Sequence, residues 1–385
     1  MYYDGGGFMT KTARNSNFEL MRIVSILLII LCHIINFGRL YNDSVNPTLR
    51  IVFEVLMFMT IVHVNSFVVL SGYFQSKSRF KLSKLIKMII QVIFYITVIF
   101  FVALKIGWID NYNIVTIINS FVPSVISNYW FINVYLITYV FSDYINLFIN
   151  KLTHKEFKNF LILCFVVLSI VPYITGFKIL INDGYSLINF IFLYMIGAYL
   201  RKYPIKDSYH FKRMSINSYR LLMFGLFFFM FILNYLFNNY AGQINGMSNV
   251  FSEIASRILN SKFTYATPFV IIQTIAYFEI FNTFKFKNKI INIISSSVIG
   301  VYLFHENPII RDNIYKILHL TNKYIIGYSD LYFVLGGVIL IFILGTIFEW
   351  TRIIIEKLVL KIPIIKKLVT KVKKFFNTFN LKINW

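Results

Sequence analysis

Apolar segments of about 20 residues recur along the whole 385-residue chain, and they constrain its fold more than any other feature. A helix that crosses the hydrocarbon core of a bilayer needs about 20 mostly apolar residues. The sequence therefore predicts an all-α polytopic membrane protein with about ten transmembrane helices. The candidate segments lie at 18–38, 51–74, 88–108, 130–149, 160–178, 186–200, 221–238, 263–281, 290–305 and 331–350.

The composition excludes soluble globular and disordered chains. Hydrophobic residues make up 58% of the sequence and charged residues only 14%, whereas an ordinary soluble domain is about 25% charged. A net charge of +22 on a soluble protein would indicate a nucleic-acid partner, but here the basic residues lie between apolar segments, so we expect membrane lipids and no nucleic acid. Cys32 and Cys164 lie inside apolar segments, so neither a disulfide framework nor a metal site is expected.

The distribution of lysine and arginine predicts the orientation. With the N-terminus in the cytoplasm, 28 of the 38 basic residues lie on the cytoplasmic side and 9 on the opposite side, so both termini are expected in the cytoplasm. The chain then divides into a cytoplasmic N-terminal segment (1–17), a transmembrane domain (18–350) and a basic amphipathic tail (351–385). The tail is expected to lie on anionic lipid headgroups.

Three ionisable residues in the first apolar segment share one helix face. Arg22 and His33 are eleven residues apart, which is about 20° more than three full turns of a helix, and Glu19 lies on the same side. Because ionisable groups inside a membrane usually face a functional cavity, we interpret this face as a channel wall, with His33 about 16 Å deeper than Arg22. The alternative is a buried Glu19–Arg22 pair and a separately hydrogen-bonded histidine.

The second apolar segment carries Glu54 and His63 and ends in Ser71-Gly72-Tyr73-Phe74. His63 is interpreted equally well as a packed, hydrogen-bonded residue or as a cavity residue. The five basic residues that follow either bind a phosphate-rich cytosolic ligand or serve only as the positive-inside signal. They are Lys77, Arg79, Lys81, Lys84 and Lys87.

Polar and aromatic residues also gather at the outer ends of two later segments. Trp130, Asn133 and Tyr135 open the fourth segment, where the rings form either an aromatic belt at the membrane interface or a surface on which a sugar stacks. His305 and Glu306 close the ninth segment near the outer boundary. The two intramembrane histidines, His33 and His305, are therefore expected at similar depths.

In their order and spacing these motifs resemble the integral-membrane acyltransferase-3 family, which acylates bacterial surface carbohydrates. The family signature in the first segment is an acidic residue, an arginine and a histidine eleven residues later, which appears here as Glu19-Leu20-Met21-Arg22 and His33. Ser71–Phe74, Trp130-Phe131 and Tyr302-Leu303-Phe304-His305 follow in the expected order. The resemblance extends from about residue 15 to residue 350.

The resemblance implies an enzyme of the cell membrane that transfers an acyl group, most often acetyl. The donor would be cytosolic acyl-CoA, and the acceptor would be a hydroxyl of an extracytoplasmic or lipid-linked polysaccharide. No permanently bound cofactor is expected. A sugar hydroxyl needs a positioned base, for which neutral histidine is suited, and His33 is the candidate. Either Glu306 or Glu54 is expected to orient a histidine ring. The expected residues are His33, His305 and Glu306 for catalysis, Arg22, Glu19, Ser71, Tyr73, Arg79, Lys81 and Lys84 for the donor, and Trp130, Asn133, Tyr135 and Glu54 for the acceptor.

The sequence departs from the family pattern at two positions and in one domain. Glu19 stands where the family more often has aspartate, and Lys81-Leu82-Ser83-Lys84 replaces an Arg-x-x-Arg pair. Lysine binds phosphate as a point charge, without the two-pronged fork of arginine. The esterase-like domain that is fused to some relatives is not expected in this chain, so the chain either completes the transfer or passes the acyl group to a partner.

The main alternative from the sequence is an exporter or flippase of a lipid-linked glycan. An intramembrane polar path with basic cytoplasmic loops suits transport as well as acyl transfer, but an exporter has no need of acyl-CoA. A purely structural subunit of a polysaccharide assembly complex explains the Arg22–His33 alignment poorly. Dependence on an acyl donor therefore separates these classes.

The first prediction concerns topology. Single cysteines introduced by Lys81→Cys and Lys366→Cys are expected to resist a membrane-impermeant thiol reagent in intact cells, because both positions lie in predicted cytoplasmic segments. Labelling is compared before and after permeabilisation, in a protein whose two native cysteines are replaced. Labelling of either position in intact cells would contradict the orientation.

Overall fold

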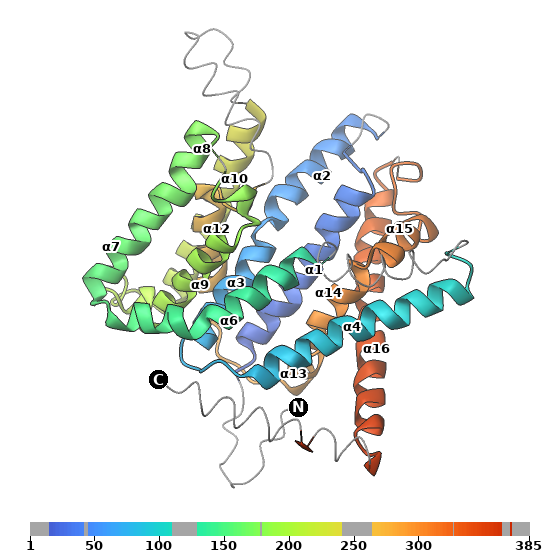
Figure 1. Ribbon diagram of the computed structural model, residues 1–385. Helices are drawn as coiled ribbons and strands as arrows, with labels where there is room; N and C mark the ends of the chain where they lie inside the picture. Colours follow the sequence, from blue (N-terminus) through green and yellow to red (C-terminus); the bar gives the residue numbers. More distant parts are fainter. Residues whose placement is uncertain are drawn as a thin grey trace.

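A computed structural model describes residues 15–41, 45–109, 129–177, 179–240, 264–325, 327–363 and 370–371 (Figure 1). These residues form helices joined by turns and loops, and none of them lies in a β-strand. The all-α fold class that the apolar segments predict is confirmed.

Most of the predicted apolar segments form one helix or two consecutive helices. The longer helices are α1 (Asn17–Phe37), α2 (Pro47–Thr60), α3 (Val62–Gln75), α4 (Leu82–Lys105), α6 (Trp130–Lys151), α7 (His154–Phe165), α9 (Leu187–Lys202), α10 (Ile216–Tyr240), α12 (Pro268–Asn282), α13 (Lys289–Ser295), α14 (Val298–His305), α15 (Pro308–Ile317) and α16 (Asp330–Val359). Short elements connect some of them: the π-helical η2 (Val166–Ile170), α8 (Val171–Thr175), and the 3₁₀ helices η3 (Asn182–Gly184) and η4 (Ile205–Asp207).

In the described part of the chain, seven helices, or eight if a bent pair counts as one span, are long and apolar enough to cross a membrane. The seven are α1, α2 with α3, α4, α6, α7 with η2 and α8, α10, and α16, and the bent pair joins α13 and α14 to α15. Helix α9 has 16 residues and α12 has 15, so both are shorter than the about 20 residues that a span needs. The described helices give a polytopic membrane protein, while ten spans and cytoplasmic termini stay predictions.

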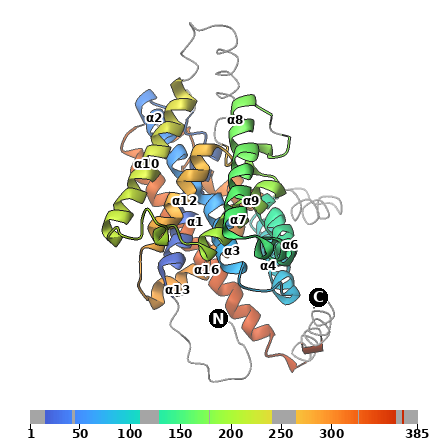
Figure 2. The same cartoon turned by 90° about the vertical axis from the view of Figure 1, so that its left-hand side faces the viewer.

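Helix α1 lies in the middle of the bundle (Figure 2) and packs against α2, α3, α12, α13, α14 and α16. Its apolar residues divide between two hydrophobic cores. Phe18 and Met21 belong to the core formed with α3, α9 and α12, and Ile26, Ile30 and Ile34 belong to the core formed with α4, α14 and α16. Because α1 contributes to both cores, its polar residues lie between the half of the bundle around the first core and the half around the second.

Glycines let α3 and α9 approach closely. A Cβ atom added at Gly72 would lie 2.0 Å from the Tyr194 carbonyl oxygen, and one added at Gly197 would lie 1.9 Å from the Val69 carbonyl oxygen. Small residues allow helix backbones to pack closely in membranes, where the hydrophobic effect does not drive helices together. The glycine of the Ser71-Gly72-Tyr73-Phe74 motif thus has a packing role.

Helix α16 continues well past residue 350, where the apolar segment was predicted to end. Arg352 donates two hydrogen bonds of 2.8 Å to the buried carboxylate of Glu349. Gln91 and Tyr95 of α4 donate to the same carboxylate at 3.1 and 2.8 Å. Because a buried charge is tolerated when it is paired and hydrogen-bonded, α16 continues through this charged group without a break.

A second prediction follows from the glycine crossing. Replacing Gly197→Ala is expected to destabilise the protein by about 1–3 kcal/mol, because the new methyl group overlaps the α3 backbone. The measurement is the melting temperature of the detergent-solubilised protein. Gly225→Ala on α10 is the control, since a Cβ there meets nothing within 4 Å. Equal melting temperatures for the two variants would show that the helices do not cross this closely.

Candidate active site

The chain turns by 87° between α14 and α15. Pro308 stands at the first position of α15, where its missing N–H is tolerated, and its ring prevents α14 from continuing. Asn307 caps α15, because its side-chain oxygen accepts a hydrogen bond of 3.1 Å from the backbone N–H of Ile309. This break leaves His305 at the end of α14 and Glu306 in the turn.

Tyr129 holds the turn from the neighbouring helix α6. Its buried hydroxyl donates to the carbonyl oxygen of Leu303 at 2.8 Å and accepts from the Asn307 amide at 3.2 Å. We assigned Tyr129 and Asn307 no role from the sequence. The only signal for them was their adjacency to Trp130 and to Glu306.

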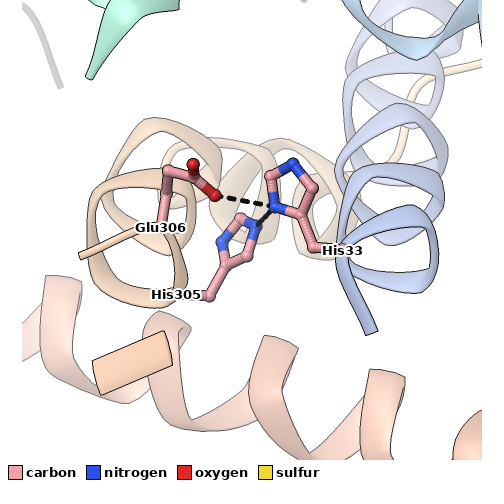
Figure 3. A group of neighbouring side chains, drawn as sticks. All are labelled: His33, His305 and Glu306. Atoms are coloured by element: carbon pink, nitrogen blue, oxygen red, sulfur yellow. Dashed lines mark hydrogen bonds and ion pairs between the residues drawn. The ribbon is translucent and has the colours of Figure 1, made fainter. Parts of the chain in front are cut away.

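The turn brings Glu306 and His305 against His33 of α1 (Figure 3). The Nδ1 atom of His33 lies 2.8 Å from a Glu306 carboxylate oxygen and 3.1 Å from the Nε2 atom of His305. His305 and Glu306 are buried, and the His33 side chain keeps 16% of its surface exposed. We call these three residues the His33 cluster.

The hydrogen bonds of the His33 cluster define which ring nitrogens carry protons. The Nδ1 atom of His305 lies 2.7 Å from the Val301 carbonyl oxygen, which can only accept, so Nδ1 carries the proton. In a neutral ring the Nε2 atom of His305 then accepts the Nδ1 proton of His33, and the Glu306 carboxylate lies beside the same nitrogen as an ion-pair neighbour. The remaining His33 nitrogen, Nε2, has an unshared electron pair and points away from both neighbours (Figure 3). It is therefore the basic atom of the cluster.

Arg311 of α15 adds a cation beside the cluster. Its guanidinium lies 3.5 Å from the second oxygen of Glu306 and 4.2 Å from the centre of the Phe37 ring. A charged neighbour favours the ionised carboxylate. We did not predict Arg311 from the sequence, because it approaches Glu306 only through the bend between α14 and α15.

The same three side chains offer nitrogen and oxygen atoms that lie within 4.8 Å of one another, and two histidines with a glutamate form a ligand set for Zn²⁺. Their separations of 2.8 and 3.1 Å are those of hydrogen bonds. Arg311 already supplies positive charge at Glu306.

At the other end of α1, Glu19 and Arg22 form an ion pair of 2.7 Å. Ser295 donates a hydrogen bond to the second carboxylate oxygen of Glu19. This is the paired arrangement that the sequence left as an alternative, although the Arg22 side chain remains 25% exposed. Ile26 and Ile29 are buried on α1 between Arg22 and His33, so this stretch of the face is packed against other helices.

The predicted donor residues after α3 lie near the Arg22 end of α1. Tyr139 of α6 anchors this loop, because its hydroxyl accepts a hydrogen bond of 3.0 Å from the Lys81 backbone N–H. The ammonium of Lys84 lies 5.5 Å from the Tyr139 ring centre and within electrostatic reach of Arg22. Arg79 is exposed in the same loop. The loop therefore offers cations at one end of the bundle.

Trp130, predicted to contact the acceptor, lies in an aromatic group that the sequence did not reveal. Its ring centre is 4.4 Å from that of Tyr185 and 6.1 Å from that of Tyr265. Tyr185 is 38% exposed, and Trp130 directly follows Tyr129, whose hydroxyl bonds to Leu303 and Asn307 beside Glu306. This group, which we call the Trp130 cluster, is therefore on the side of the bundle that carries the His33 cluster.

Other predicted residues are placed differently from the expectation. Ser71 donates a hydrogen bond of 3.2 Å to the Tyr135 hydroxyl, so one predicted donor residue and one predicted acceptor residue touch directly. Asn133 is partly buried on α6. Glu54 is partly buried on α2 and makes no hydrogen bond or ion pair with the His33 cluster in the described part of the chain. Of the two carboxylates considered for orienting a histidine, Glu306 is the one in contact.

His63 is a packed, hydrogen-bonded residue. Its Nδ1 atom donates to the Thr60 carbonyl oxygen at 2.5 Å, and its Nε2 atom accepts from the Tyr265 hydroxyl at 3.5 Å. Both nitrogens of this buried ring are used. His63 thus links α3 to the Trp130 cluster and has no nitrogen left for chemistry.

Comparison with known proteins identifies a family. A family model described as an acyltransferase domain matches residues 15–350, most of the chain and all three residues of the His33 cluster. No curated protein and no solved structure matches.

A third prediction concerns the carboxylate of the cluster. Glu306→Gln removes the negative charge that stabilises a protonated His33 ring, so the rate of acyl transfer is expected to fall about 10²-fold or more. The matched control is Asp312→Asn, an exposed carboxylate that contacts Arg311 and not His33. The measurement is the initial transfer rate of protein in nanodiscs. Equal rates for the two variants would remove Glu306 from the active site.

Proposed function

Because this chain belongs to the acyltransferase-3 family and has several membrane-spanning helices, we propose that it transfers an acetyl group from cytosolic acetyl-CoA to a hydroxyl of a cell-surface or lipid-linked polysaccharide. The enzyme acts in the cell membrane and needs no permanently bound cofactor. The observation that carries the proposal is the His33 cluster, which keeps one histidine nitrogen basic and directed away from its neighbours.

The chemistry of the His33 cluster fits a direct transfer. The Nε2 atom of His33 takes the proton of the sugar hydroxyl while the hydroxyl oxygen attacks the thioester carbonyl. The carbon–sulfur bond then breaks, and the protonated histidine returns its proton to the CoA sulfur. Glu306 stabilises the transient positive charge of the His33 ring, since its carboxylate lies 2.8 Å from Nδ1. His305 and Arg311 hold the ring and the carboxylate in this geometry.

The donor is proposed to enter from the Arg22 end of α1. Arg79, Lys81 and Lys84 supply positive charge there for the phosphates of acetyl-CoA, and Arg22, whose charge Glu19 balances, offers its remaining N–H donors. The rise along α1 from Arg22 to His33 is about 16 Å, which the extended arm of CoA can span. Because Ile26 and Ile29 fill the helix face between them, the arm must pass beside α1 or displace its neighbours.

The acceptor is proposed to bind at the Trp130 cluster. Sugars present C–H groups on one face of the ring, and aromatic side chains give those groups a flat apolar surface. Tyr185 is the exposed ring of the cluster, and Trp130 and Tyr265 pack against it. Trp130 directly follows Tyr129, which bonds to the turn that carries Glu306, so a sugar stacked on the cluster is proposed to present a hydroxyl to His33.

A fourth prediction tests the enzyme against the exporter. His33→Gln keeps a polar side chain but removes the base, so transfer is expected to fall by about 10²–10⁴-fold. NMR of the surface polysaccharide is expected to show glycan that is present but not acetylated. Cys32→Ala, one residue away on α1, is the control and should leave acetylation near the wild-type level.

Two outcomes would overturn the proposal. Wild-type acetylation in the His33→Gln strain would remove His33 as the base. Loss of the glycan itself from the surface of that strain, with no change in the acetylation of the remainder, would instead favour the exporter.

A further inference from the structure

Arg201 occupies a position to which the sequence assigned no role. It lies in the last turn of α9, partly buried, and its Nη1 group donates a hydrogen bond of 2.9 Å to the Tyr73 hydroxyl. The guanidinium carbon is also 4.7 Å from the centre of the Tyr73 ring. Arg201 therefore sits on the Ser71-Gly72-Tyr73-Phe74 motif of α3.

The charge of Arg201 is uncompensated in the described part of the chain. Three other buried or partly buried arginines pair with carboxylates: Arg22 with Glu19, Arg311 with Glu306, and Arg352 with Glu349 and Glu356. Arg220 instead bonds to Asn217 and Thr283 through all three of its guanidinium nitrogens. Among the described residues Arg201 has no such partner, and only one of its five N–H donors is used. Four N–H donors of Arg201 therefore remain for an anionic ligand, whereas each guanidinium nitrogen of Arg220 is already bonded.

The surroundings of Arg201 are rigid. Gly197, one turn earlier on α9, crosses α3 in backbone contact with Val69 and Tyr73. The Tyr73 ring packs against Phe18, Phe74 and Phe278 with centre-to-centre distances of 5.0 to 5.2 Å. Arg201 is thus held in place without a ligand, as a preorganised binding site requires.

Arg201 and Arg22 flank the same pair of rings. The Arg22 guanidinium lies 5.6 Å from the centre of the Phe74 ring, and Phe74 packs against Tyr73, on which Arg201 lies. Phe74 is 43% exposed. Two guanidinium groups therefore border one partly exposed aromatic surface, although one of them, Arg22, is already neutralised by Glu19.

We infer that Arg201 binds a phosphate group of the acyl donor, with the Tyr73 hydroxyl and ring holding its guanidinium in position. The inference rests on the proposed function and adds a residue to its donor site. A guanidinium binds phosphate through two parallel N–H bonds, and Arg201 supplies the fork that Lys81-Leu82-Ser83-Lys84 lacks. The preferred donor is therefore a thioester whose carrier is phosphorylated, as opposed to a phosphate-free thioester.

The experiment compares two donors that share a thioester arm. Acetyl-CoA carries phosphates and S-acetyl-pantetheine does not. For protein in nanodiscs, Arg201→Gln is expected to raise the KM for acetyl-CoA about 10-fold or more, because a hydrogen-bonded ion pair is lost, and to leave kcat near wild type. The same variant should have an unchanged KM for S-acetyl-pantetheine. Arg201→Lys should recover part of the affinity for acetyl-CoA, since it restores the charge without the fork.

Arg220→Gln is the matched control. This arginine is also partly buried, stacks on Phe284 at 4.6 Å and bonds to Thr283, but it does not contact Tyr73. It should leave both KM values unchanged. An equal rise in KM for both donors in Arg201→Gln, or no rise for either, would overturn the inference.

Binding of CoA by calorimetry separates this inference from the proposed function. In one outcome, the wild type binds CoA but transfers no acetyl group, and Arg201→Gln binds CoA at least about 10-fold more weakly. This outcome supports the phosphate site and contradicts the proposed reaction. In the other outcome, the wild type transfers acetyl groups and Arg201→Gln has the same affinity for CoA as the wild type. This outcome supports the proposed reaction and contradicts the phosphate site.

Discussion

The 2.8 Å contact between His33 and Glu306 is the interaction on which the active-site geometry depends. It joins the first helix of the bundle to the break between α14 and α15, far along the chain. A lone carboxylate at this depth would be unfavourable, and Glu306 is tolerated because His33 and Arg311 surround it. The contacts that stabilise the buried Glu306 carboxylate therefore also prepare His33 to accept a proton.

The rest of the bundle follows the same constraint on buried charge. Glu19 is paired with Arg22, and Glu349 is paired with Arg352 and bonded by residues of α4. These pairs neutralise themselves, whereas Arg201 has no acidic partner in the described structure. Helix α1 extends between the proposed donor and acceptor ends. The His33 cluster lies at one end of α1, and the cations that are proposed to bind a phosphorylated donor lie at the other end.

Sequence patterns predicted the all-α membrane fold because apolar length is a local property. They also identified His33, His305 and Glu306 as candidates, because ionisable residues inside apolar segments are rare. Contacts that depend on tertiary structure escaped prediction: Arg311 reaches Glu306 only through an 87° bend, and Tyr185 reaches Trp130 from a different helix connection. The pairing of Arg352 with Glu349 and Glu356 also escaped prediction, since hydropathy counts each charge singly and does not see its partners.

The most direct test of the His33–Glu306 unit is a double-mutant cycle on the rate of acetyl transfer. The wild type, His33→Gln, Glu306→Gln and the double variant are compared in nanodiscs at one pH. If Glu306 acts by orienting and stabilising the His33 ring, its replacement has no further effect once the ring is gone, and the double variant is as slow as His33→Gln alone. If the two single effects multiply in the double variant, the residues act independently and the account of the site is contradicted.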